Sequence, residues 1–303
     1  MIDFQPLTLE TKPLYQPYLM DGQERGCEYS FANLYLWGRQ RAALLHGHMV
    51  LFSQFSRRSV YPYPAGTGDK KPVLDAIVED ARQRGIPCRI TGLGQPEMEL
   101  LEQLYPGQFR FHCDRDSYDY VYDINDLADL KGRKYQKKRN HFNRFRDAFP
   151  YYTVSPITPA LLPKVQEMVA QWYEHRLRED PSGDYHMERS AIGKALAHLE
   201  ELSMEGLVLL DGEDVLAMTL GSRLSEDTFD IHFEKARPDT EGAYPVINCE
   251  FARYLRSKYP EVKFLNREDD LGLEGLRKAK LSYYPHHLVE KCWACQLEDG
   301  YDY

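Results

Sequence analysis

Apolar residues follow two spacings along this chain, and the spacings predict an alternating series of helices and strands. A spacing of three or four residues is typical of helices, whereas every second position is typical of strands. In the first half we expect helices at 9–20, 29–37, 70–84 and 94–105, with strands at 42–46, 49–55, 59–62, 88–91, 109–113 and 118–122. In the second half we expect helices at 158–178, 188–202, 244–258 and 271–280, with strands at 151–155, 207–210, 215–224, 228–234, 263–265 and 287–293.

The two halves share one order of elements, although no sequence identity links them. Each has two helices, three antiparallel strands, a turn with glycine, a long helix, a short strand, a further helix and terminal strands. This order resembles that of the acyl-CoA N-acyltransferase (GNAT) fold. We therefore expect an α+β protein of two tandem GNAT-like domains, each a mixed, largely antiparallel sheet flanked by helices. The expected domains are residues 1–125 and 150–303, joined by a basic linking helix at 126–149.

A cationic stretch lies at residues 131–146, within this linker. It holds eight Lys and Arg residues and no Asp or Glu, so it contributes +8 to a chain whose formal net charge is −9. The rest of the chain therefore carries −17. Fixed positive charge on an acidic protein attracts anions, and phosphates are the usual anions in cells.

Apolar residues recur at helical spacing through the same stretch, which predicts an amphipathic helix that Gly132 could interrupt. On a helical wheel, Lys131 and Lys138 fall inside the apolar face, whereas Lys137 falls on the solvated face. Two interpretations stay open. The helix binds an anion through Lys131, Lys137, Lys138 and Arg139, or it is a solvated helix whose long side chains lie along the surface.

A turn that contains glycine precedes the long helix of each half. In the GNAT fold this turn and the helix N-terminus offer backbone N–H groups to a pyrophosphate. In the second half the candidate phosphate-binding residues are Arg237, Gly242, Ala243 and Tyr244. In the first half Asp69 follows the glycines and repels phosphate, so we interpret that turn as structural.

Polar residues alternate with apolar ones in the predicted strand 228–234. Phe229, Ile231 and Phe233 are expected on one face, and the other face carries Asp230, His232 and Glu234. If that face lines a cleft, Glu234 or His232 is the general base that accepts a proton from an attacking amine or hydroxyl. The alternative is an exposed face of an antiparallel sheet.

Polar residues also gather after the short strand that ends near Leu265. Asn266, Arg267 and Glu268 fit a site at the carboxyl end of a strand, and the aspartates that follow equally fit the cap of the next helix. Lys280 lies at the end of that helix, where it either complements the helix dipole or stabilises negative charge on a substrate.

Global features narrow the class of protein. No apolar run reaches the roughly 18–20 residues that span a bilayer, and no leader is read at the N-terminus, so we expect a cytoplasmic protein. The six cysteines are scattered, which fits reduced thiols. Cys292 and Cys295 form a single CxxC that lacks the second pair of a zinc ribbon, and we expect no metal site.

Several motifs point to one family. They are Lys137-Lys138-Arg139-Asn140-His141, Glu234-Lys235, Glu241-Gly242-Ala243-Tyr244, Asn266-Arg267-Glu268-Asp269-Asp270 and Gly275-Leu276-Arg277-Lys278-Ala279-Lys280-Leu281-Ser282-Tyr283. Together they resemble an uncharacterised family that is similar to the C-terminal catalytic domain of phosphatidylglycerol lysyltransferase. The resemblance covers nearly the whole chain. It implies tandem GNAT-like domains, as in the Fem peptidoglycan aminoacyltransferases, with aminoacyl-tRNA as donor and a lipid headgroup or cell-wall-precursor amine as acceptor.

The resemblance also bears on single residues. In those relatives a Gly-Leu-aromatic-x-Phe-Lys run supplies a functional lysine, and Lys280 holds the matching position here. Arg277 and Ala279 replace the aromatic residues of that run. The multi-helix membrane domain of the full lysyltransferase has no counterpart in this sequence, so only peripheral membrane binding is expected.

Two functional hypotheses follow. The first is an acyl- or aminoacyltransferase that uses acyl-CoA or aminoacyl-tRNA as a co-substrate, holds no tightly bound cofactor, and acts on an amine or hydroxyl. In it, Glu234, His232, Lys280 and Glu268 are the catalytic candidates, while Asn266 and Arg267 join the phosphate-binding set. The alternative is a module on the same fold that binds an anionic ligand without chemistry.

Overall fold

The computed structural model describes residues 1–21, 26–55 and 58–297. The chain forms two compact units, and each unit is assembled from segments that are distant in the sequence. Unit 1 consists of Met1–Tyr120, Glu268–Lys280 and His287–Tyr303, whereas unit 2 consists of Val121–Arg267 and Leu281–His286. Among the described residues, no helix combines the length and the apolar content that crossing a bilayer requires.

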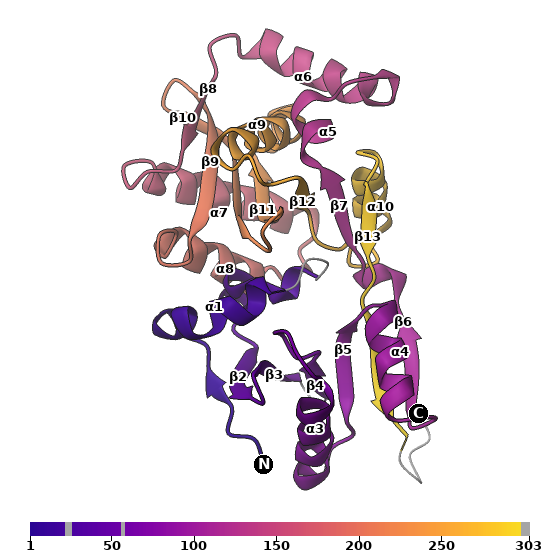
Figure 1. Cartoon of the computed structure of the whole chain (residues 1–303). Helices are drawn as coiled ribbons and strands as arrows, with labels where there is room; N and C mark the ends of the chain where they lie inside the picture. The colour runs from indigo at the N-terminus through magenta and orange to yellow at the C-terminus, as the bar shows by residue number, and fades with distance from the viewer. Residues whose placement is uncertain (22–25, 56–57, 298–303) are drawn as a thin grey trace. The chain divides into compact units, whose positions relative to one another are not determined.

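Unit 1 is a mixed sheet flanked by helices (Figure 1). In spatial order its strands are β1 (Gln5–Pro6), β2 (Gln40–Leu45), β3 (His48–Phe55), β4 (Arg58–Pro62), β5 (Arg89–Leu93), β14 (Cys292–Gln296) and β6 (Phe109–Cys113). Its helices are α1 (Lys12–Met20), α2 (Phe31–Trp37), α3 (Lys71–Arg84) and α4 (Gln95–Leu104), with short 3-10 turns η1 (Leu9–Thr11), η2 (Cys27–Tyr29) and η3 (Arg115–Ser117). The apolar stripe of α3, which includes Val73 and Ile77, packs on the sheet in one buried core.

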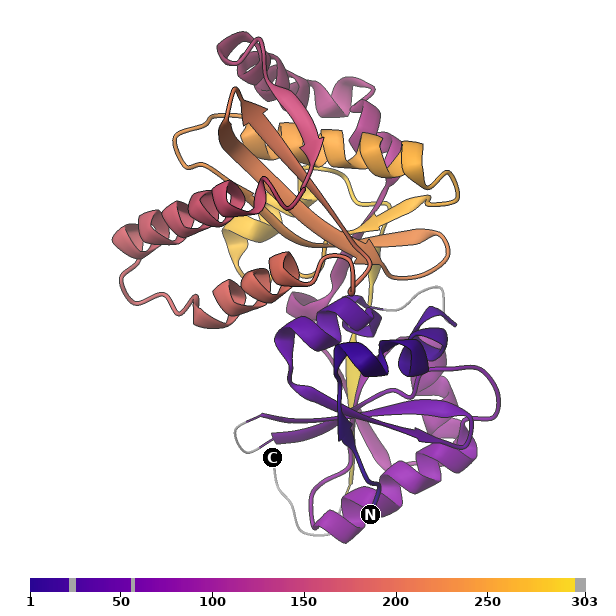
Figure 2. The ribbon, with the colours of Figure 1, turned by 90° about the vertical axis from the view of Figure 1, so that its left-hand side faces the viewer.

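Unit 2 repeats this plan. Its strands lie in the order β7 (Asp119–Asp123), β12 (Phe264–Asn266), β11 (Thr228–Ala236), β10 (Asp214–Arg223), β9 (Met204–Asp211) and β8 (Thr153–Pro156), and β7 enters the unit at Val121. Its helices are α5 (Ile124–Asp129), α6 (Gln136–Ala148), α7 (Leu162–Glu179), α8 (His186–Ala197) and α9 (Ala243–Lys258), with a 3-10 turn η4 (Arg133–Tyr135). Figure 2 shows α9 lying across the strands of this sheet. The remaining elements, α10 (Glu274–Leu281) and β13 (His287–Val289), lie in the C-terminal part of the chain.

The order of elements agrees with the prediction, but the division of the chain differs from it. The expected second domain ran from 150 to 303, and the expected linker was a separate helix. Instead α6 belongs to unit 2, and residues 268–280 and 287–303 belong to unit 1. The reason is strand pairing, because β14 lies antiparallel between β5 and β6 of unit 1.

The two sheets thus exchange strands. In unit 1, β5 pairs with β4 in parallel and with β14, which comes from the last part of the chain. In unit 2, β12 pairs with β11 in parallel and with β7, which comes from the first half. Each sheet is completed by a strand from the other half of the sequence.

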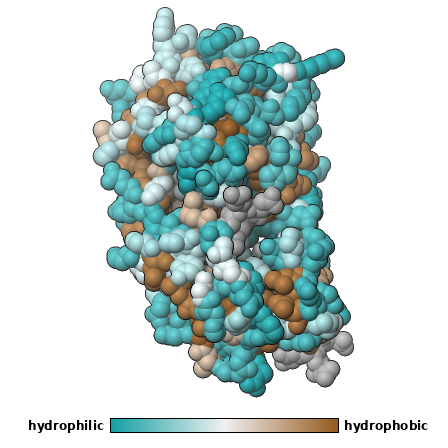
Figure 3. All heavy atoms as spheres, in the orientation of Figure 1, coloured by the Kyte–Doolittle hydropathy of each residue, from teal (hydrophilic) through white to brown (hydrophobic). Residues whose placement is uncertain are grey.

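The predicted cationic helix is interrupted. Gly132 has φ +87°, a backbone conformation that favours glycine, and it separates the end of α5 from η4 and α6. Lys131 is therefore not on the apolar face of α6. Its side chain is 83% exposed and pairs with Asp129. Figure 3 shows a largely hydrophilic surface in the region where Figure 1 places α6.

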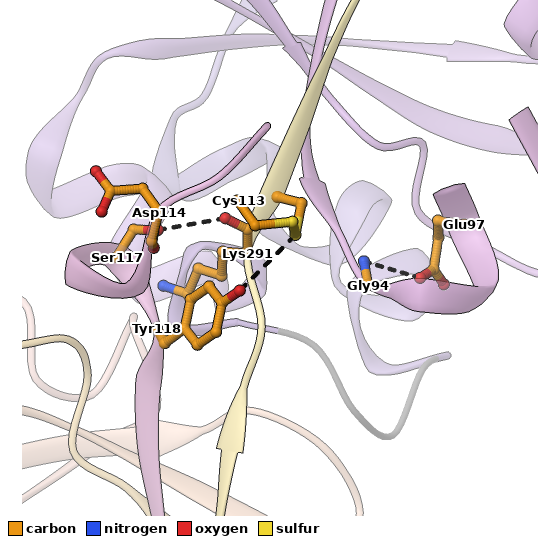
Figure 4. Close-up of a disulfide and its surroundings, with 8 residues drawn as sticks. Gly94, Glu97, Cys113, Asp114, Ser117, Tyr118 and Lys291 are labelled. Carbon is orange, nitrogen blue, oxygen red and sulfur yellow. Dashed lines mark hydrogen bonds between the residues drawn. A yellow bond between two sulfur atoms is a disulfide. The ribbon is translucent and has the colours of Figure 1, made fainter. Parts of the chain in front are cut away.

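Two cysteines differ from the expectation that all six are reduced thiols. Cys113 and Cys292 face each other across β6 and β14 and form a disulfide (Figure 4). Their sequence separation of 179 residues hid this pairing from the sequence. Cys27, Cys88, Cys249 and Cys295 are buried and take part in no disulfide within the described residues.

Candidate active site

The candidate site lies where two parallel strands of unit 2 separate. β11 and β12 pair from Thr228 to Asp230, with Asn266 opposite Asp230. β12 then ends, whereas β11 continues to Ala236. Ligands of open α/β sheets bind beyond the carboxyl ends of the strands. His232, Glu234 and Arg267 all follow this point of separation.

A β-bulge in β11 changes the face of the sheet to which the following side chains point. Leu220 lies opposite Phe233, whereas the next residue, Gly221, lies opposite Ile231. His232 is therefore an extra residue in β11. The alternation predicted for 228–234 holds through His232, which contacts Ser222 and Asp230 on the predicted face. It is wrong for Phe233 and Glu234, because the bulge shifts the side chains that follow it to the other face.

Opposed residues of an antiparallel pair share a face, and this assigns the polar side chains. Asp230 lies opposite Ser222, whereas Glu234 lies opposite Thr219. Ser222 and Thr219 are three residues apart on β10, so they point to different faces. Asp230 and Glu234 therefore occupy different faces and do not form the single polar row that the sequence suggested.

Glu234 forms an ion pair with Arg267. Oε2 of Glu234 accepts hydrogen bonds from Nη2 of Arg267 at 2.7 Å and from Nε at 3.1 Å. Their side chains are only 10% and 16% exposed. Although burial opposes its charge, Arg267 has a pKa above the ordinary value because Glu234 lies beside it. The guanidinium also lies 5.0 Å from the ring centroid of Tyr283 and 5.7 Å from that of Tyr122.

The second oxygen of the Glu234 carboxylate has a different environment. Oε1 is buried and receives no hydrogen bond from the part of the chain that the structure describes. A buried carboxylate oxygen without a donor is costly, so this atom is ready to accept a hydrogen bond or a proton from a ligand.

Lys138 of α6 completes the cluster. Its Nζ lies 3.7 Å from the centroid of the Tyr283 ring, and it forms no ion pair within the described residues. Burial, together with the positive charge of Arg267, lowers the pKa of Lys138 to about 8. Lys138 and Arg267 thus both lie against the ring of Tyr283, and of the two only Arg267 pairs with Glu234 among the described residues. The positive charge of Lys138 therefore favours an anion.

His232 belongs to a separate buried network. Its Nε2 lies 2.8 Å from Oγ of Ser222, and its Nδ1 lies 3.3 Å from Oδ2 of Asp230. The side chain of His232 is 1% exposed and that of Asp230 is fully buried. Ser222, His232 and Asp230 follow one another as a nucleophile, a base and an orienting acid do in a catalytic triad. These three groups are buried in the sheet, however, and so a structural network describes them better.

The turn before α9 is covered by α6. Gly242 has φ +83°, and a Cβ added there would lie 2.7 Å from the carbonyl oxygen of His141. Arg237 pairs with Asp239 at 3.0 Å, and Ala243 is fully buried. The hydroxyl of Tyr244 accepts a hydrogen bond from Trp172 Nε1 at 3.0 Å. The structure therefore brings the turn and the cationic helix together, with the glycine as the point of close contact.

The other cationic candidates of α6 lie outside the cluster. Lys137 is exposed, as predicted. Arg139 donates to the carbonyl oxygens of Leu130 and Gly132, and so satisfies groups at the end of α5. Arg139 thus has partners within the fold, whereas Lys131 and Lys137 present positive charge at the surface.

Lys280 and Glu268 lie in unit 1. Lys280 is buried, and its Nζ donates a 3.0 Å hydrogen bond to the carbonyl oxygen of Glu268. The same nitrogen lies 5.7 Å from the centroid of the Tyr120 ring. Glu268 has φ +58°, and Oε1 of its side chain accepts a 3.4 Å hydrogen bond from Asn33. The catalytic roles of both residues stay predictions.

Sequence reasoning missed three residues of these networks. Tyr122 and Tyr283 provide the aromatic surfaces for Arg267 and Lys138, and Ser222 contacts His232. Tyr283 was visible only as the last member of a sequence motif. The other two carried no signal, because their contacts depend on strand register.

Comparison with known proteins identifies the family. The sequence model of the family described as "Phosphatidylglycerol lysyltransferase, C-terminal" matches residues 21–295. The chain belongs to this family. The Lys138, Glu234, Arg267 and Tyr283 cluster therefore lies in unit 2 of a phosphatidylglycerol lysyltransferase C-terminal family protein.

Solved structures share the fold of this chain. A conserved protein of unknown function from Bacteroides thetaiotaomicron VPI-5482 is 37% identical, with a TM-score of 0.93, over 98% of this chain and 100% of that one. L-PGS from Bacillus licheniformis is 16% identical, with a TM-score of 0.70, over 98% of this chain and 94% of that one.

The fold prediction is confirmed. A tandem GNAT protein from the clavulanic acid biosynthesis pathway is 9% identical, with a TM-score of 0.50, over 97% of this chain and 98% of that one. This family member thus has two tandem GNAT-like units on a transferase-like fold. An uncharacterised protein of Mycoplasmoides gallisepticum is 22% identical over 176 residues, and the chain spans only 55% of that relative's length.

Proposed function

We propose that this protein is an aminoacyl- or acyltransferase whose reaction centre is the cluster of Lys138, Glu234, Arg267 and Tyr283. The donor carries phosphate, as aminoacyl-tRNA and acyl-CoA both do, and the acceptor is an amine or a hydroxyl. The observation that carries the proposal is the buried Oε1 of Glu234, which lacks a donor among the described residues while Arg267 holds Oε2.

Each group has a role that its environment supports. Oε1 of Glu234 accepts a proton from the attacking amine or hydroxyl. Arg267 fixes the carboxylate and, with the ammonium of Lys138, stabilises negative charge that develops on the acyl group or resides on a phosphate. Burial strengthens these electrostatic interactions, because the local dielectric is lower than that of water.

We propose aminoacyl-tRNA as the donor, because the resemblance to aminoacyltransferases favours it. The corresponding acceptor is a lipid headgroup or a cell-wall-precursor amine. The exposed cations of the basic helix support a tRNA donor, since phosphate contacts by Lys and Arg dominate nucleic-acid affinity. A tRNA complex held in this way loses affinity steeply as salt rises, whereas a complex with a small thioester depends less on salt.

The direct experiment supplies the purified protein with lysyl-tRNA, other charged tRNAs or acetyl-CoA, together with phosphatidylglycerol vesicles or amine acceptors. Transfer of radiolabel from one donor class, lost in Glu234→Gln, would support the proposal. Glu241→Gln is the matched control, because Glu241 is an exposed glutamate of the same β11–α9 connection. If Glu234→Gln turns over at the wild-type rate, Glu234 is not the base. If charged tRNA or CoA binds without transfer, the chain is an anion-binding module instead.

A further inference from the structure

A cavity of about 280 Å³ lies in unit 1, and none of its lining residues belongs to the cluster described above. It opens at the carboxyl ends of the parallel strands β4 and β5, where Tyr63 and Gly94 follow those strands. This is where open α/β sheets place ligands. At about 30 Å³ per water, the cavity has room for roughly nine waters, or a small metabolite.

One side of the cavity is apolar and the other is acidic. The rings of Tyr29 and Tyr63 and the side chains of Leu288 and Val289 supply apolar surface. The acidic lining residues are Glu28, Glu97 and Glu290, and Lys291 is the lysine among the lining residues. The lining therefore suits a molecule with a hydrocarbon part and a polar head.

Lys291 is not available to bind an anion. Its Nζ lies 2.6 Å from Asp119 Oδ1, 3.0 Å from Glu28 Oε2 and 3.4 Å from Cys27 Sγ. An ammonium group has three donors, and these three acceptors use them. Although burial opposes its charge, the pKa of Lys291 is well above the ordinary value because Asp119 lies beside it. Its ammonium also lies among Cys27, Glu28 and Asp119, where it takes the place that a metal ion would need.

The carboxylates, in contrast, retain free acceptor atoms. Oε2 of Glu97 accepts a 3.0 Å hydrogen bond from the Gly94 N–H, as Figure 4 shows. Within the described part of the chain, no donor reaches Oε1 of Glu97 or Oε1 of Glu28. Gly92, at φ +73°, keeps this space open, since a Cβ there would lie 2.9 Å from the Tyr29 hydroxyl and 3.2 Å from Oε1 of Glu28.

We propose that this cavity binds a small primary amine with a short hydrocarbon chain. The ammonium head donates to the free oxygens of Glu28 and Glu97, and the chain lies against Tyr29, Tyr63, Leu288 and Val289. The proposal does not rest on the proposed transfer reaction, because the lining holds none of the residues of the proposed reaction centre. The sequence suggested a purely structural role for the glycine turn of this unit. The proposal gives the unit a ligand at a different place, the cavity beyond β4 and β5.

The test compares three probes of equal size on the full chain: n-butylammonium, 1-butanol and n-butyrate. Isothermal titration or ligand-detected NMR is expected to show binding of n-butylammonium, at least tenfold tighter than that of either other probe. Equal or tighter binding of butyrate would overturn the proposal, as would the absence of n-butylammonium binding at neutral pH.

Variants of the lining locate the site. Glu28→Gln and Glu97→Gln keep the side-chain shape, and a Gln at position 97 still accepts from the Gly94 N–H. Each is expected to weaken n-butylammonium binding at least fivefold. Glu99→Gln, a matched change on α4 outside the cavity lining, is expected to leave binding unchanged. If both lining variants fold, as circular dichroism would show, and bind like wild type, the cavity is not the amine site.

Discussion

The ammonium of Lys138 lies 3.7 Å from the centroid of the Tyr283 ring, and its pKa is lowered to about 8. Only the charged form attracts an anion, so we expect affinity for inorganic pyrophosphate to fall as the pH rises through about 8. Lys138→Met is expected to weaken binding roughly tenfold, about 1.4 kcal/mol, and to remove this pH dependence. Titration calorimetry from pH 6.5 to 9.5 measures both effects. Wild-type affinity that stays constant across this range would contradict the assignment.

The same depressed pKa affects stability with a defined sign. In the unfolded chain a lysine keeps its proton up to about pH 10.4, whereas Lys138 in the folded protein loses it near pH 8. The unfolded state therefore binds more protons between these values, and the contribution of Lys138 raises the free energy of unfolding with pH. Lys138→Met is expected to reduce the slope of unfolding free energy against pH in this window. Chemical denaturation at pH 8 and pH 10 measures the slope, with the exposed Lys137→Met as control.

Substitutions of Glu234 and of His232 are expected to affect activity and stability differently. Because Glu234 presents an oxygen without a donor and His232 is enclosed by Ser222 and Asp230, Glu234→Gln is expected to lower kcat by roughly 10²–10⁴-fold. It is also expected to lower Tm, because it leaves the buried charge of Arg267 without its carboxylate. His232→Asn is expected to lower Tm, because it breaks a buried network. Steady-state kinetics and thermal unfolding of both variants separate these outcomes. A kcat collapse confined to His232→Asn would reverse the assignment.

Gly242 provides a test of how α6 is held. Gly242→Ala is expected to be destabilising, since its Cβ would lie 2.7 Å from the His141 carbonyl and the residue would need a positive φ. Displacement of α6 would also move Lys138, so pyrophosphate binding should weaken even in folded protein. Gly212→Ala is the control, because it has a similar φ of +57° but open space around the added carbon. Equal losses in the two variants would mean that backbone strain alone is responsible.

The Cys113–Cys292 disulfide is expected to stabilise unit 1, because it closes a long loop. Removal of such a bond typically costs about 2–5 kcal/mol. A reductant should lower the Tm of the wild-type protein and leave that of Cys113→Ala/Cys292→Ala unchanged. Intact-mass measurement after alkylation, with and without reduction, counts the thiols. Full alkylation without reduction would show that the bond does not form.

Local sequence patterns predicted most elements, because turns and helix ends are encoded nearby. The strand expected at 109–113 is β6 as observed, since Pro106 and Gly107 end the helix before it. Helical spacing also predicted that Lys138 lies on the apolar face of the helix, and the structure shows it half-buried against Tyr283. Glu234 and Arg267 were predicted as candidates, and the structure shows that they pair.

Features that depend on strand register could not be predicted in this way. The bulge at His232 is defined only by its partner strand β10, and it reverses which face Glu234 occupies. The exchange of β7 and β14, and with it the Cys113–Cys292 bond, depends on pairings across distant parts of the chain. The sequence shows the residues of β7 and β14, but it does not show which strands they pair with.

The position of β14 has a consequence for biosynthesis. This strand lies between β5 and β6, yet it is translated about 180 residues after β6. The sheet of unit 1 therefore has a gap through most of translation, and two strand edges stay open until Cys292–Gln296 leaves the ribosome. We expect nascent chains that stop before this strand to depend on chaperones, however well their remaining residues match the final sheet.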